Sequence, residues 1–322
     1  MSLKRVIDCI KKNKVFVITS HQNLEGDALG SEISFYNLLR KLGKSAIIVN
    51  QDPTPQVYTN VLGSRLIKKF RHNMKLKFDV LVMLDCSDKS RCGPVACLAI
   101  SGQPIVNIDH HISNDKFGDI NWVLPAASSV AEMVYRIYKR MHIKIDVDTA
   151  KALYVGILTD TGSFSYINTT SFTHKVTAEL LKFNLDIPKI YRDIYESISF
   201  ADMSLLTKII STLERDASGK IIIFQIKQEL LRGRKIYFDL TENVLRFGRL
   251  IHGSEACVLF REQQRKKREV RVNLRSQGRK VDVNCIAQFF GGGGHRTASG
   301  CTLSGTLKTV KQKVIDKIKE QL

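Results

Sequence analysis

Four short apolar segments of this chain each end abruptly at an acidic residue or a histidine. The segments are residues 15–19, 80–84, 105–108 and 153–158, and the polar side chains that follow belong to His21, Asp85, Asp109, His110, His111 and Asp160. An apolar run that stops at polar residues is typical of a buried strand that opens into a loop. In a parallel α/β sheet such loops meet at one edge, where ligands bind. The pattern therefore predicts that these side chains gather at one sheet edge.

The residue types at these positions favour a metal site. Together with Glu25 and Asp27, which follow the first segment, the candidate ligands are His21, Glu25, Asp27, Asp85, His110 and Asp160. A single acidic residue after a strand is usually a cap or a turn residue, and an isolated Asp-His-His can be a pair of loop histidines without a role. Four such coincidences in one domain favour convergence on a metal. Carboxylates mixed with imidazole suit Mn²⁺ or Mg²⁺, and no cysteine joins the set.

The same residues form motifs that occur in a known order. The motifs are His21-x-x-x-Glu25-Gly26-Asp27-Ala28-x-Gly30-Ser31, Asp85, Asp109-His110-His111, Asp160-Thr161-Gly162 and Gly291-Gly292-Gly293-Gly294-His295. Through these motifs, which extend over nearly the whole chain, the sequence resembles the DHH phosphoesterases, and among them the two-domain nanoRNase and RecJ-like type. It departs from the family pattern at Glu25, where Asp is usual, and at Leu24, where Pro is usual. The extra methylene of Glu25 bears on the geometry of one metal site.

The resemblance implies an α/β fold with a division of roles between two domains. A parallel-sheet DHH domain with helices on both faces would be followed by a smaller α/β domain, with the active site in the cleft between them. One metal ion would be held by His21, Glu25 and Asp85, and a second by Asp27, Asp85, His110 and Asp160. Asp85 would bridge the two ions, His111 would contact the scissile phosphate, and Asp109 would orient the histidines.

The resemblance also implies a substrate-binding set near the end of the chain, composed of Asn273, Arg275, Ser276, Gly292, Gly293, Gly294 and His295. The chemistry is suitable, because glycines can expose backbone N–H groups to an anion and Arg binds phosphate through two N–H groups. A glycine run by itself is more often a flexible loop.

The length of 322 residues predicts about two domains. We expect a catalytic domain at 1–185, a helical linker at 186–211 and a substrate-binding domain at 212–322. Residues 149–158 are rich in Ala and Leu, and favour a buried helix over a strand. The charged residues 261–269 predict a hairpin turn, whose tip is either solvated or in contact with nucleic acid.

The formal net charge of +19 attracts polyanions such as nucleic acid or an acidic membrane surface, unless it only reflects a lysine-rich proteome. Seven cysteines without a C-x-x-C pair indicate a reduced, cytoplasmic protein rather than a disulfide framework or a zinc site. We expect no signal peptide, and no apolar run approaches the roughly 20 residues that span a membrane. The sequence allows a homodimer.

Together these features predict a Mn²⁺-dependent hydrolase, with Mg²⁺ as the alternative metal. We expect it to hydrolyse short oligoribonucleotides to mononucleotides, and 3′-phosphoadenosine 5′-phosphate to AMP, by two-metal activation of water. Two core domains alone make long DNA a poorer substrate. One alternative is a phosphodiesterase for linear or cyclic dinucleotides. Another, motivated by Glu25 and the positive charge, is a non-catalytic protein that binds nucleotides or RNA.

Overall fold

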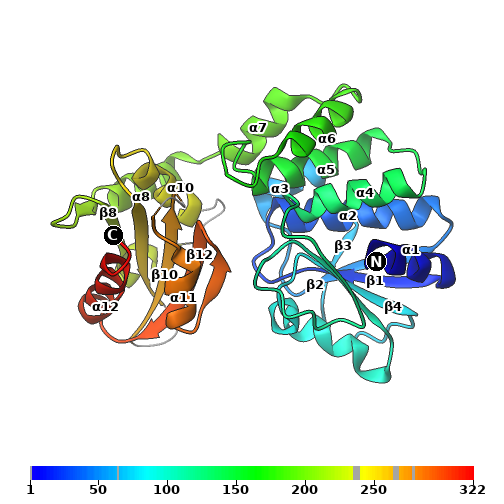
Figure 1. Cartoon of the computed structure of the whole chain (residues 1–322), viewed down its shortest axis with the longest axis horizontal. Coiled ribbons are helices and arrows are strands. Elements are labelled where there is room, and N and C mark those ends of the chain that lie inside the picture. Colours follow the sequence, from blue (N-terminus) through cyan, green and yellow to red (C-terminus); the bar gives the residue numbers. More distant parts are fainter. Residues whose placement is uncertain (1, 64, 235–239, 264–267, 278–279) are drawn as a thin grey trace. The chain divides into compact units, whose positions relative to one another are not determined.

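The computed structural model describes residues 2–63, 65–234, 240–263, 268–277 and 280–322, and it divides into two compact units, 1–197 and 198–322 (Figure 1). The division lies inside the segment predicted as a linker. In chain order, the elements of unit 1 are α1 (Ser2–Lys12), β1 (Val15–Thr19), α2 (Gly26–Lys41), β2 (Ser45–Asn50), α3 (Gln56–Leu62), β3 (Ile67–Lys69), β4 (Val80–Leu84), the 3₁₀ segment η1 (Lys89–Ser101), β5 (Ile105–Asp109), β6 (Ile120–Val123), α4 (Val130–Arg140), α5 (Val147–Asp160), α6 (Ser171–Leu181) and α7 (Ile187–Tyr195).

Unit 1 is built on a six-stranded parallel sheet in the order β3-β2-β1-β4-β5-β6. Alternate residues of each strand face opposite sides, so that Phe16 and Ile18 of β1 enter one core and Val17 enters another. The first core is shared with the α-helices, and Figure 1 shows α2, α4 and α5 along that face. The second is closed by η1 and by residues 70–78.

The α-helices of unit 1 cover one face of the sheet and the 3₁₀ segment η1 covers the other, so helical segments lie on both faces as expected. The strand order explains this division. The connection from β1 to β2 runs in one direction across the sheet, and the connection from β4 to β5 runs in the other. Because such crossovers are right-handed, the two connections must lie on opposite faces. Here the second connection is the 3₁₀ segment η1, in which Pro94 and the left-handed Gly93 interrupt a regular helix.

Close packing of α2 on α5 fixes the acidic residues at their ends. A Cβ atom on Gly30 would lie 2.3 Å from the carbonyl oxygen of Ala152, and one on Gly156 would lie 2.9 Å from Asp27 Oδ1. Both positions therefore require glycine for the two backbones to approach. Asp27 in the first turn of α2 and Asp160 at the end of α5 are held by this contact. Residues 149–158 are helical, as predicted from their composition, so the interpretation of residues 153–158 as a strand is wrong.

Unit 2 comprises α8 (Phe200–Ile210), β7 (Glu214–Arg215), β8 (Ile221–Ile226), α9 (Gln228–Leu231), α10 (Leu240–Arg249), β9 (Ala256–Glu262), β10 (Glu269–Ser276), α11 (Val283–Phe289), β11 (Gly293–His295), β12 (Ala298–Ser304) and α12 (Leu307–Lys319). They form a second six-stranded sheet in the order β11-β12-β10-β9-β8-β7, with β8 and β9 parallel and the other pairs antiparallel. One side of the sheet packs with α11 and α12, and the other with α8 and α10.

Two details of unit 2 concern Leu250 and the glycine run. Leu250 lies beyond the end of α10, and its side chain is 72% exposed. The four glycines are not a free loop, because Gly293 and Gly294 belong to β11. The tip of the charged hairpin, residues 264–267, lies outside the described residues, so its proposed contact with nucleic acid stays a prediction.

Candidate active site

Three neighbouring strands of the unit 1 sheet deliver the predicted polar residues to one edge. β1, β4 and β5 are adjacent, and His21, Asp85 and His110 follow their carboxyl ends. Connections leave β1 and β4 in opposite directions, so the crevice between these two strands is a topological switch point. Ligands bind at such points in open α/β sheets. The sequence-based prediction of convergence at this edge agrees with the geometry.

Asp85 stands at the centre of this group. It has a left-handed backbone conformation with φ 57°, which costs of order 1 kcal/mol in a residue other than glycine. The turn directs the carboxylate between two imidazoles. Asp85 Oδ2 lies 3.2 Å from Nε2 of His21, and Oδ1 lies 3.7 Å from Nε2 of His110. Such strain in a buried residue is typical of functional sites.

The two imidazoles are oriented by backbone carbonyl groups. Nδ1 of His21 donates to the carbonyl oxygen of Gln22 at 2.6 Å, and Nδ1 of His110 donates to that of Ala127 at 3.2 Å. Because a carbonyl oxygen only accepts, the proton of each neutral ring is on Nδ1 and the lone pair is on Nε2. The lone pairs point toward the carboxylates, which is the usual arrangement of metal-binding histidines.

A second group forms around His110. Asp27, His110 and Asp160 each offer a ligand atom within 4.8 Å of the others, and His110 Nε2 lies 3.3 Å from Asp160 Oδ2. Asp27 is also fixed by the start of α4, where the N–H groups of Val130 and Ala131 donate to its two oxygens at 2.7 and 2.8 Å. The positive end of a helix dipole favours a carboxylate there.

Glu25 joins His21 and Asp85 in a corresponding group with the same 4.8 Å limit. Its Oε1 lies 3.9 Å from Nε2 of His21, and its side chain is 52% exposed. It occupies the N-cap position of α2 but makes no side-chain cap hydrogen bond. The carboxylate of Glu25 is thus near the other candidate ligands, and capping does not explain its presence.

Charges within the site change the protonation of its members. Burial alone lowers the pKa of His21, but the hydrogen bond to Asp85 and the negative charges of Asp85 and Glu25 raise it to about 9. Burial also lowers the pKa of His110, but the negative charges of Asp160, Asp85 and Asp27 raise it to about 10. Burial also raises the pKa of Asp27, to about 7. The cluster therefore has a strong electrostatic preference for bound positive charge.

Two buried oxygen atoms test whether a metal ion suits these residues. Asp85 Oδ1 and Asp160 Oδ2 have no hydrogen-bond donor among the described residues. A buried carboxylate oxygen without a donor costs free energy unless a cation binds it. Both atoms lie beside Nε2 of His110, at 3.7 and 3.3 Å. Oxygen and imidazole ligands without cysteine suit a hard or intermediate divalent ion, so the residues fit a metal site.

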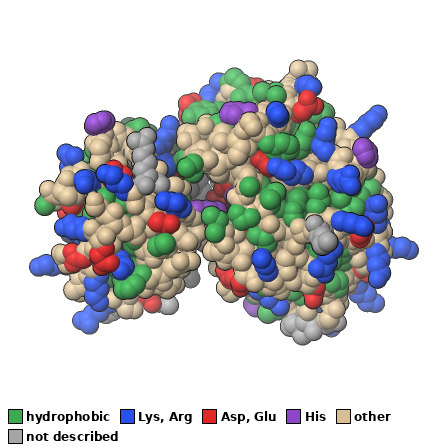
Figure 2. Space-filling view, in the orientation of Figure 1, with side chains coloured by type: hydrophobic (Ala, Val, Ile, Leu, Met, Phe, Trp, Pro, Cys, Tyr) green, Lys and Arg blue, Asp and Glu red, His purple; other side chains and the backbone are tan. Residues whose placement is uncertain are grey.

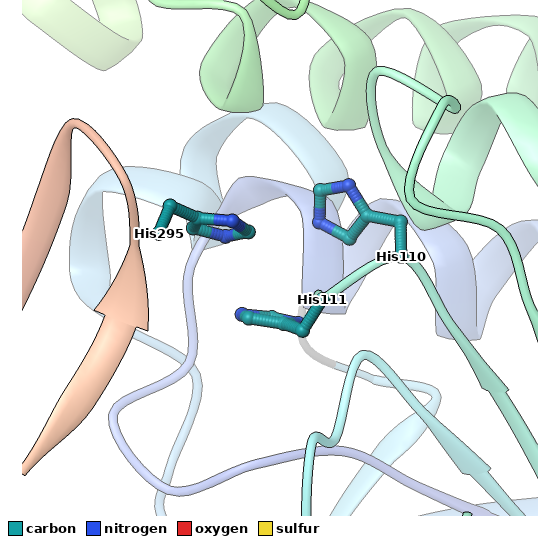
Figure 3. Close-up of side chains that lie close together, drawn as sticks. All are labelled: His110, His111 and His295. Carbon is teal, nitrogen blue, oxygen red and sulfur yellow. The ribbon is translucent and has the colours of Figure 1, made fainter. Parts of the chain in front are cut away.

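His111 is oriented separately from His110. Figure 3 shows both rings at the end of β5, and their centroids are 5.1 Å apart at 70° to each other. Asp109 Oδ1 accepts a 2.7 Å hydrogen bond from Nδ1 of His111, and its other oxygen accepts one of 2.6 Å from Asn114. Asp109 thus orients His111, whereas the carbonyl group of Ala127 orients His110.

Sequence reasoning missed several residues that support this edge. Asn114 also donates to Asn107 Oδ1 and to the carbonyl oxygen of Cys86, and so ties the loop after Asp85 to β5. The charge of Arg91 is near enough to lower the pKa of His21. The hydroxyl group of Ser129 caps α4 by accepting a hydrogen bond from the N–H group of Glu132. Isolated Asn and Arg residues in loops carry no periodic signal that would reveal these contacts.

In unit 2, the strand pairing aligns part of the predicted substrate-binding set on one face of the sheet. Arg275 is opposite Ala298, which is opposite His295, and Asn273 is opposite Gly300, which is opposite Gly293. Directly opposed residues point to the same face, and alternate residues along a strand share a face. Only the methyl group of Ala298 lies between Arg275 and His295, and no side chain lies between Asn273 and Gly293, because residue 300 is glycine.

Two members of that set have different surroundings from those expected. Ser276 alternates with Arg275, so it faces the other way, where its hydroxyl group donates to the carbonyl oxygen of Arg296. The N–H group of Gly292 donates to the carbonyl oxygen of Ala287 and closes the end of α11, so it is not exposed to an anion. A Cβ at Gly292 would lie 2.2 Å from the carbonyl oxygen of Gly300, which explains the glycine by packing.

Arg275 is already bound within unit 2. Its Nε and Nη2 atoms donate to Glu242 Oε2 at 3.1 and 2.9 Å. Arg249 donates to the other oxygen of Glu242 at 2.7 Å. Glu242, which sequence reasoning missed, therefore holds two arginines, and a phosphate at Arg275 would have to share or replace this contact.

Comparison with known proteins agrees with the geometry of both units. The profile described as "DHH family, N-terminal domain" matches residues 15–157, and the DHHA1 domain matches residues 239–322. The chain belongs to the DHH family. This confirms the resemblance drawn from the motifs, and the match of the first domain includes His21, Glu25, Asp27, Asp85, His110 and His111.

Known proteins are similar to this DHH protein over most of its length. A bifunctional oligoribonuclease and PAP phosphatase NrnA from Thermus thermophilus is 29% identical, over 95% of this chain and 89% of the relative. The protein of the same name from Bacillus subtilis is 32% identical, over 63% of this chain and 64% of the relative. The crystal structure of an exopolyphosphatase-related protein from Bacteroides fragilis matches with a TM-score of 0.86 and 25% identity, over 99% of this chain and 95% of that one. Within the described residues, no helix is long and apolar enough to cross a membrane.

Proposed function

We propose that this DHH protein is a metal-dependent phosphoesterase that hydrolyses short oligoribonucleotides to mononucleotides and 3′-phosphoadenosine 5′-phosphate to AMP. The names of the similar bifunctional enzymes support both substrates. The single observation that carries the proposal is the pair of buried oxygens, Asp85 Oδ1 and Asp160 Oδ2, which lack hydrogen-bond donors and lie beside Nε2 of His110, an imidazole oriented by the carbonyl group of Ala127. A protein that only bound nucleotides would have no need to maintain this costly arrangement.

The proposed ligands form two sets that share Asp85. His21, Glu25 and Asp85 would hold one divalent ion, and Asp27, Asp85, His110 and Asp160 would hold the other. Mn²⁺ is the proposed metal because imidazole is present in both sets, and Mg²⁺ is the alternative. When bound, such ions lower the pKa of a coordinated water and stabilise negative charge on a phosphoryl group.

The remaining residues at this edge would act on the substrate directly. Asp109 fixes the Nδ1 proton of His111, so the opposite ring nitrogen has a set direction and can contact the scissile phosphate. Asn114 fixes Asp109 in turn, which limits rotation of His111. This arrangement supports positioning of the phosphate by a side chain that does not need to bind metal.

Unit 2 would supply contacts to the rest of the nucleotide. Asn273, Arg275 and His295 project from one face of its sheet, and they are the proposed contacts. Arg275 would bind phosphate with Glu242 still limiting its orientation. Gly293 and Gly294 would allow the substrate to approach the backbone of β11. Ser276 and Gly292 would support this face by packing and hydrogen bonding rather than by touching substrate.

A hydrolysis panel tests the proposal. Purified protein with Mn²⁺ is incubated with 3′-phosphoadenosine 5′-phosphate, RNA and DNA of two to 24 nucleotides, a linear and a cyclic dinucleotide, and pyrophosphate. We expect release of mononucleotides from short RNA and of phosphate from 3′-phosphoadenosine 5′-phosphate, with loss of both activities in EDTA. Turnover of dinucleotides alone would replace the proposal with a dinucleotide phosphodiesterase. Binding without turnover of any substrate would reject an enzymatic role.

A further inference from the structure

The segment between Asp52 and Asp79 contains no acidic residue and carries several exposed basic side chains, on both faces of the edge strand β3 and in the residues that follow it. We define the basic strip as Lys68, Lys69, Arg71, Lys75 and Lys77. None of the five makes an ion pair or a side-chain hydrogen bond with any residue that the structure describes. Figure 2 shows Lys and Arg side chains scattered over the visible face together with Asp and Glu, whereas the segment of the strip contains no acidic residue.

The strip is held in place by the apolar residues between its members. Phe70, Met74 and Leu76 pack against the second core of unit 1, and Phe78 is buried in it. Because Lys75 and Lys77 alternate with these residues, they are directed outward. The backbone is therefore anchored on the sheet while the ammonium groups remain in solvent, which is a stable arrangement for an electrostatic surface.

The strip begins at the edge of the sheet that carries the candidate metal ligands. Lys69 is paired with Asn50 at the carboxyl end of β2, and the N–H group of Phe70 donates to the carbonyl oxygen of Asn50. Asn50 Oδ1 accepts from the N–H group of Ser20, the residue before His21. β3 and β1 are two strand spacings apart, which is about 10 Å. A polyanion cleaved at the metal site could therefore continue onto the strip.

We propose that the basic strip binds the phosphates of a single-stranded oligoribonucleotide beyond the scissile phosphate. The proposal rests on the proposed function and adds a length preference to it. RNA longer than a dinucleotide gains contacts with the strip, whereas 3′-phosphoadenosine 5′-phosphate, a single nucleotide, is bound without it. Each phosphate contact also releases counterions, so the contribution of the strip decreases as salt rises.

Single-stranded nucleic acid fits the strip better than a membrane surface does. The exposed ring of His72 lies edge to face against Phe70, with centroids 5.5 Å apart, among the basic residues. Aromatic rings interleaved with basic residues are characteristic of surfaces that bind single strands. Membrane-binding segments instead expose large apolar side chains for insertion, and those of residues 70–78 pack onto the core. Lysines on an edge strand can also prevent it from pairing with another chain. That role would explain Lys68 and Lys69 in β3, but it does not require Arg71, Lys75 and Lys77, which follow the strand.

The test compares two variants that lose the same charge. The strip variant is K68Q/K69Q/R71Q, and the control is K4Q/K11Q/K12Q on α1, whose residues are exposed and precede β1 at the opposite end of the strand. Steady-state kinetics are measured in Mn²⁺ with 3′-phosphoadenosine 5′-phosphate, a dinucleotide, a pentanucleotide and a dodecanucleotide over a range of salt. The variants K68R/K69R and K75Q/K77Q are measured in parallel.

We expect the strip variant to raise KM for the pentanucleotide about tenfold, with kcat and all constants for 3′-phosphoadenosine 5′-phosphate within twofold of wild type. Its log kcat/KM should depend less steeply on log salt, by about 2 for three lost phosphate contacts on a single strand. The control and K68R/K69R should resemble wild type. K75Q/K77Q should affect the dodecanucleotide more than the pentanucleotide.

Several outcomes would overturn the proposal. An equal effect in the strip variant and the control would assign the effect to net charge. An equal effect on 3′-phosphoadenosine 5′-phosphate and RNA would assign it to the metal site. Unchanged kinetics with loss of sedimentation on vesicles of phosphatidylglycerol would indicate a membrane surface, and unchanged kinetics with aggregation would indicate edge protection. If wild type hydrolyses nothing, the proposed function fails, and fluorescence anisotropy with labelled RNA of the same lengths still tests the strip by itself.

Discussion

Nε2 of His110 lies 3.3 Å from Oδ2 of Asp160, and this contact joins the end of strand β5 to the end of helix α5. The two residues approach because α5 packs on α2, with Gly156 facing Asp27. A helix end thus completes a group of ligands that strands begin. Because both atoms are buried, a substitution of His110 or Asp160 should weaken metal binding and should change the surface charge little.

The first prediction concerns Asp85, which lies between His21 and His110. D85N keeps the size of the side chain and tolerates the left-handed backbone. It removes the negative charge that both imidazoles face, so we expect hydrolysis to decrease at least about 100-fold at saturating Mn²⁺. Far-ultraviolet circular dichroism should be unchanged.

D148N is the matched control, because Asp148 is exposed in the first turn of α5. It should keep wild-type activity. If D85N retains more than a few per cent of wild-type turnover, the assignment of Asp85 as a ligand shared by both sets is wrong.

The second prediction concerns pH. The pKa values of about 9 for His21 and about 10 for His110 are above the unfolded value of 6.5. Their protonation therefore stabilises the metal-free fold fully below pH 6.5, and this stabilisation is lost as pH rises through 9. The raised pKa of Asp27 changes the stability in the same direction near pH 7. Asp85 has a lowered pKa, so it does not titrate in this range.

We therefore expect the Tm in EDTA to decrease from pH 6.5 to 9. Mg²⁺ and protons compete for His21 and His110, and fewer protons compete at higher pH. The increase in Tm caused by Mg²⁺ should therefore become larger from pH 6.5 to 9. Differential scanning fluorimetry of both forms checks this. An increase that is constant with pH would mean that the histidines do not exchange protons for metal.

The strands of the active-site edge could be predicted from sequence because their signal is local. Hydrophobic runs marked β1 and β4 with their observed bounds, and Asp85 follows from the abrupt end of β4. The sequence also contained a signal for the orientation of Ser276, because this residue is in step with the apolar Val272 and Leu274 and alternates with Arg275. The signal was overlooked because Asn273, Arg275 and Ser276 were assigned together as substrate-binding residues.

Other features depend on contacts between distant segments. Glu242 reaches Arg275 only because α10 packs beside β10, and no pattern in the sequence specifies that pairing. Asn114 could not be distinguished from an ordinary turn residue before its three acceptors were known. The candidate metal ligands were easier to predict because they lie at or near the start or end of a regular element.

The third prediction separates the two units. R275A and H295A should decrease kcat/KM for RNA by about 100-fold, the loss expected when a charged hydrogen bond to phosphate is removed. Both variants should bind Mn²⁺ as wild type does in isothermal titration calorimetry, because the candidate metal ligands belong to unit 1. S276A serves as the control within β10 and should have activity near that of wild type. Weaker Mn²⁺ binding in H295A would contradict the separation of roles.

The last prediction concerns Glu25, where this chain departs from the family pattern. Its Oε1 lies 3.9 Å from Nε2 of His21, its side chain is half exposed, and it makes no cap hydrogen bond. The carboxylate can therefore move toward a metal ion at little cost. The extra methylene shifts the oxygens by about one C–C bond, roughly 1.5 Å, which exceeds the tolerance of a rigid ligand shell. Leu24 in place of Pro leaves the preceding backbone free to adjust.

We expect Glu25 to bind the first metal ion, and more weakly than Asp would. In calorimetric titrations with Mn²⁺, E25D should match wild type or tighten the weaker of two sites, and E25A should lose that site. Hydrolysis by E25A should decrease in parallel at limiting Mn²⁺ and recover in part when Mn²⁺ is raised. If E25A binds two ions with unchanged affinity and turns over normally, Glu25 is not a ligand, and the first ion would be held by His21 and Asp85 without it.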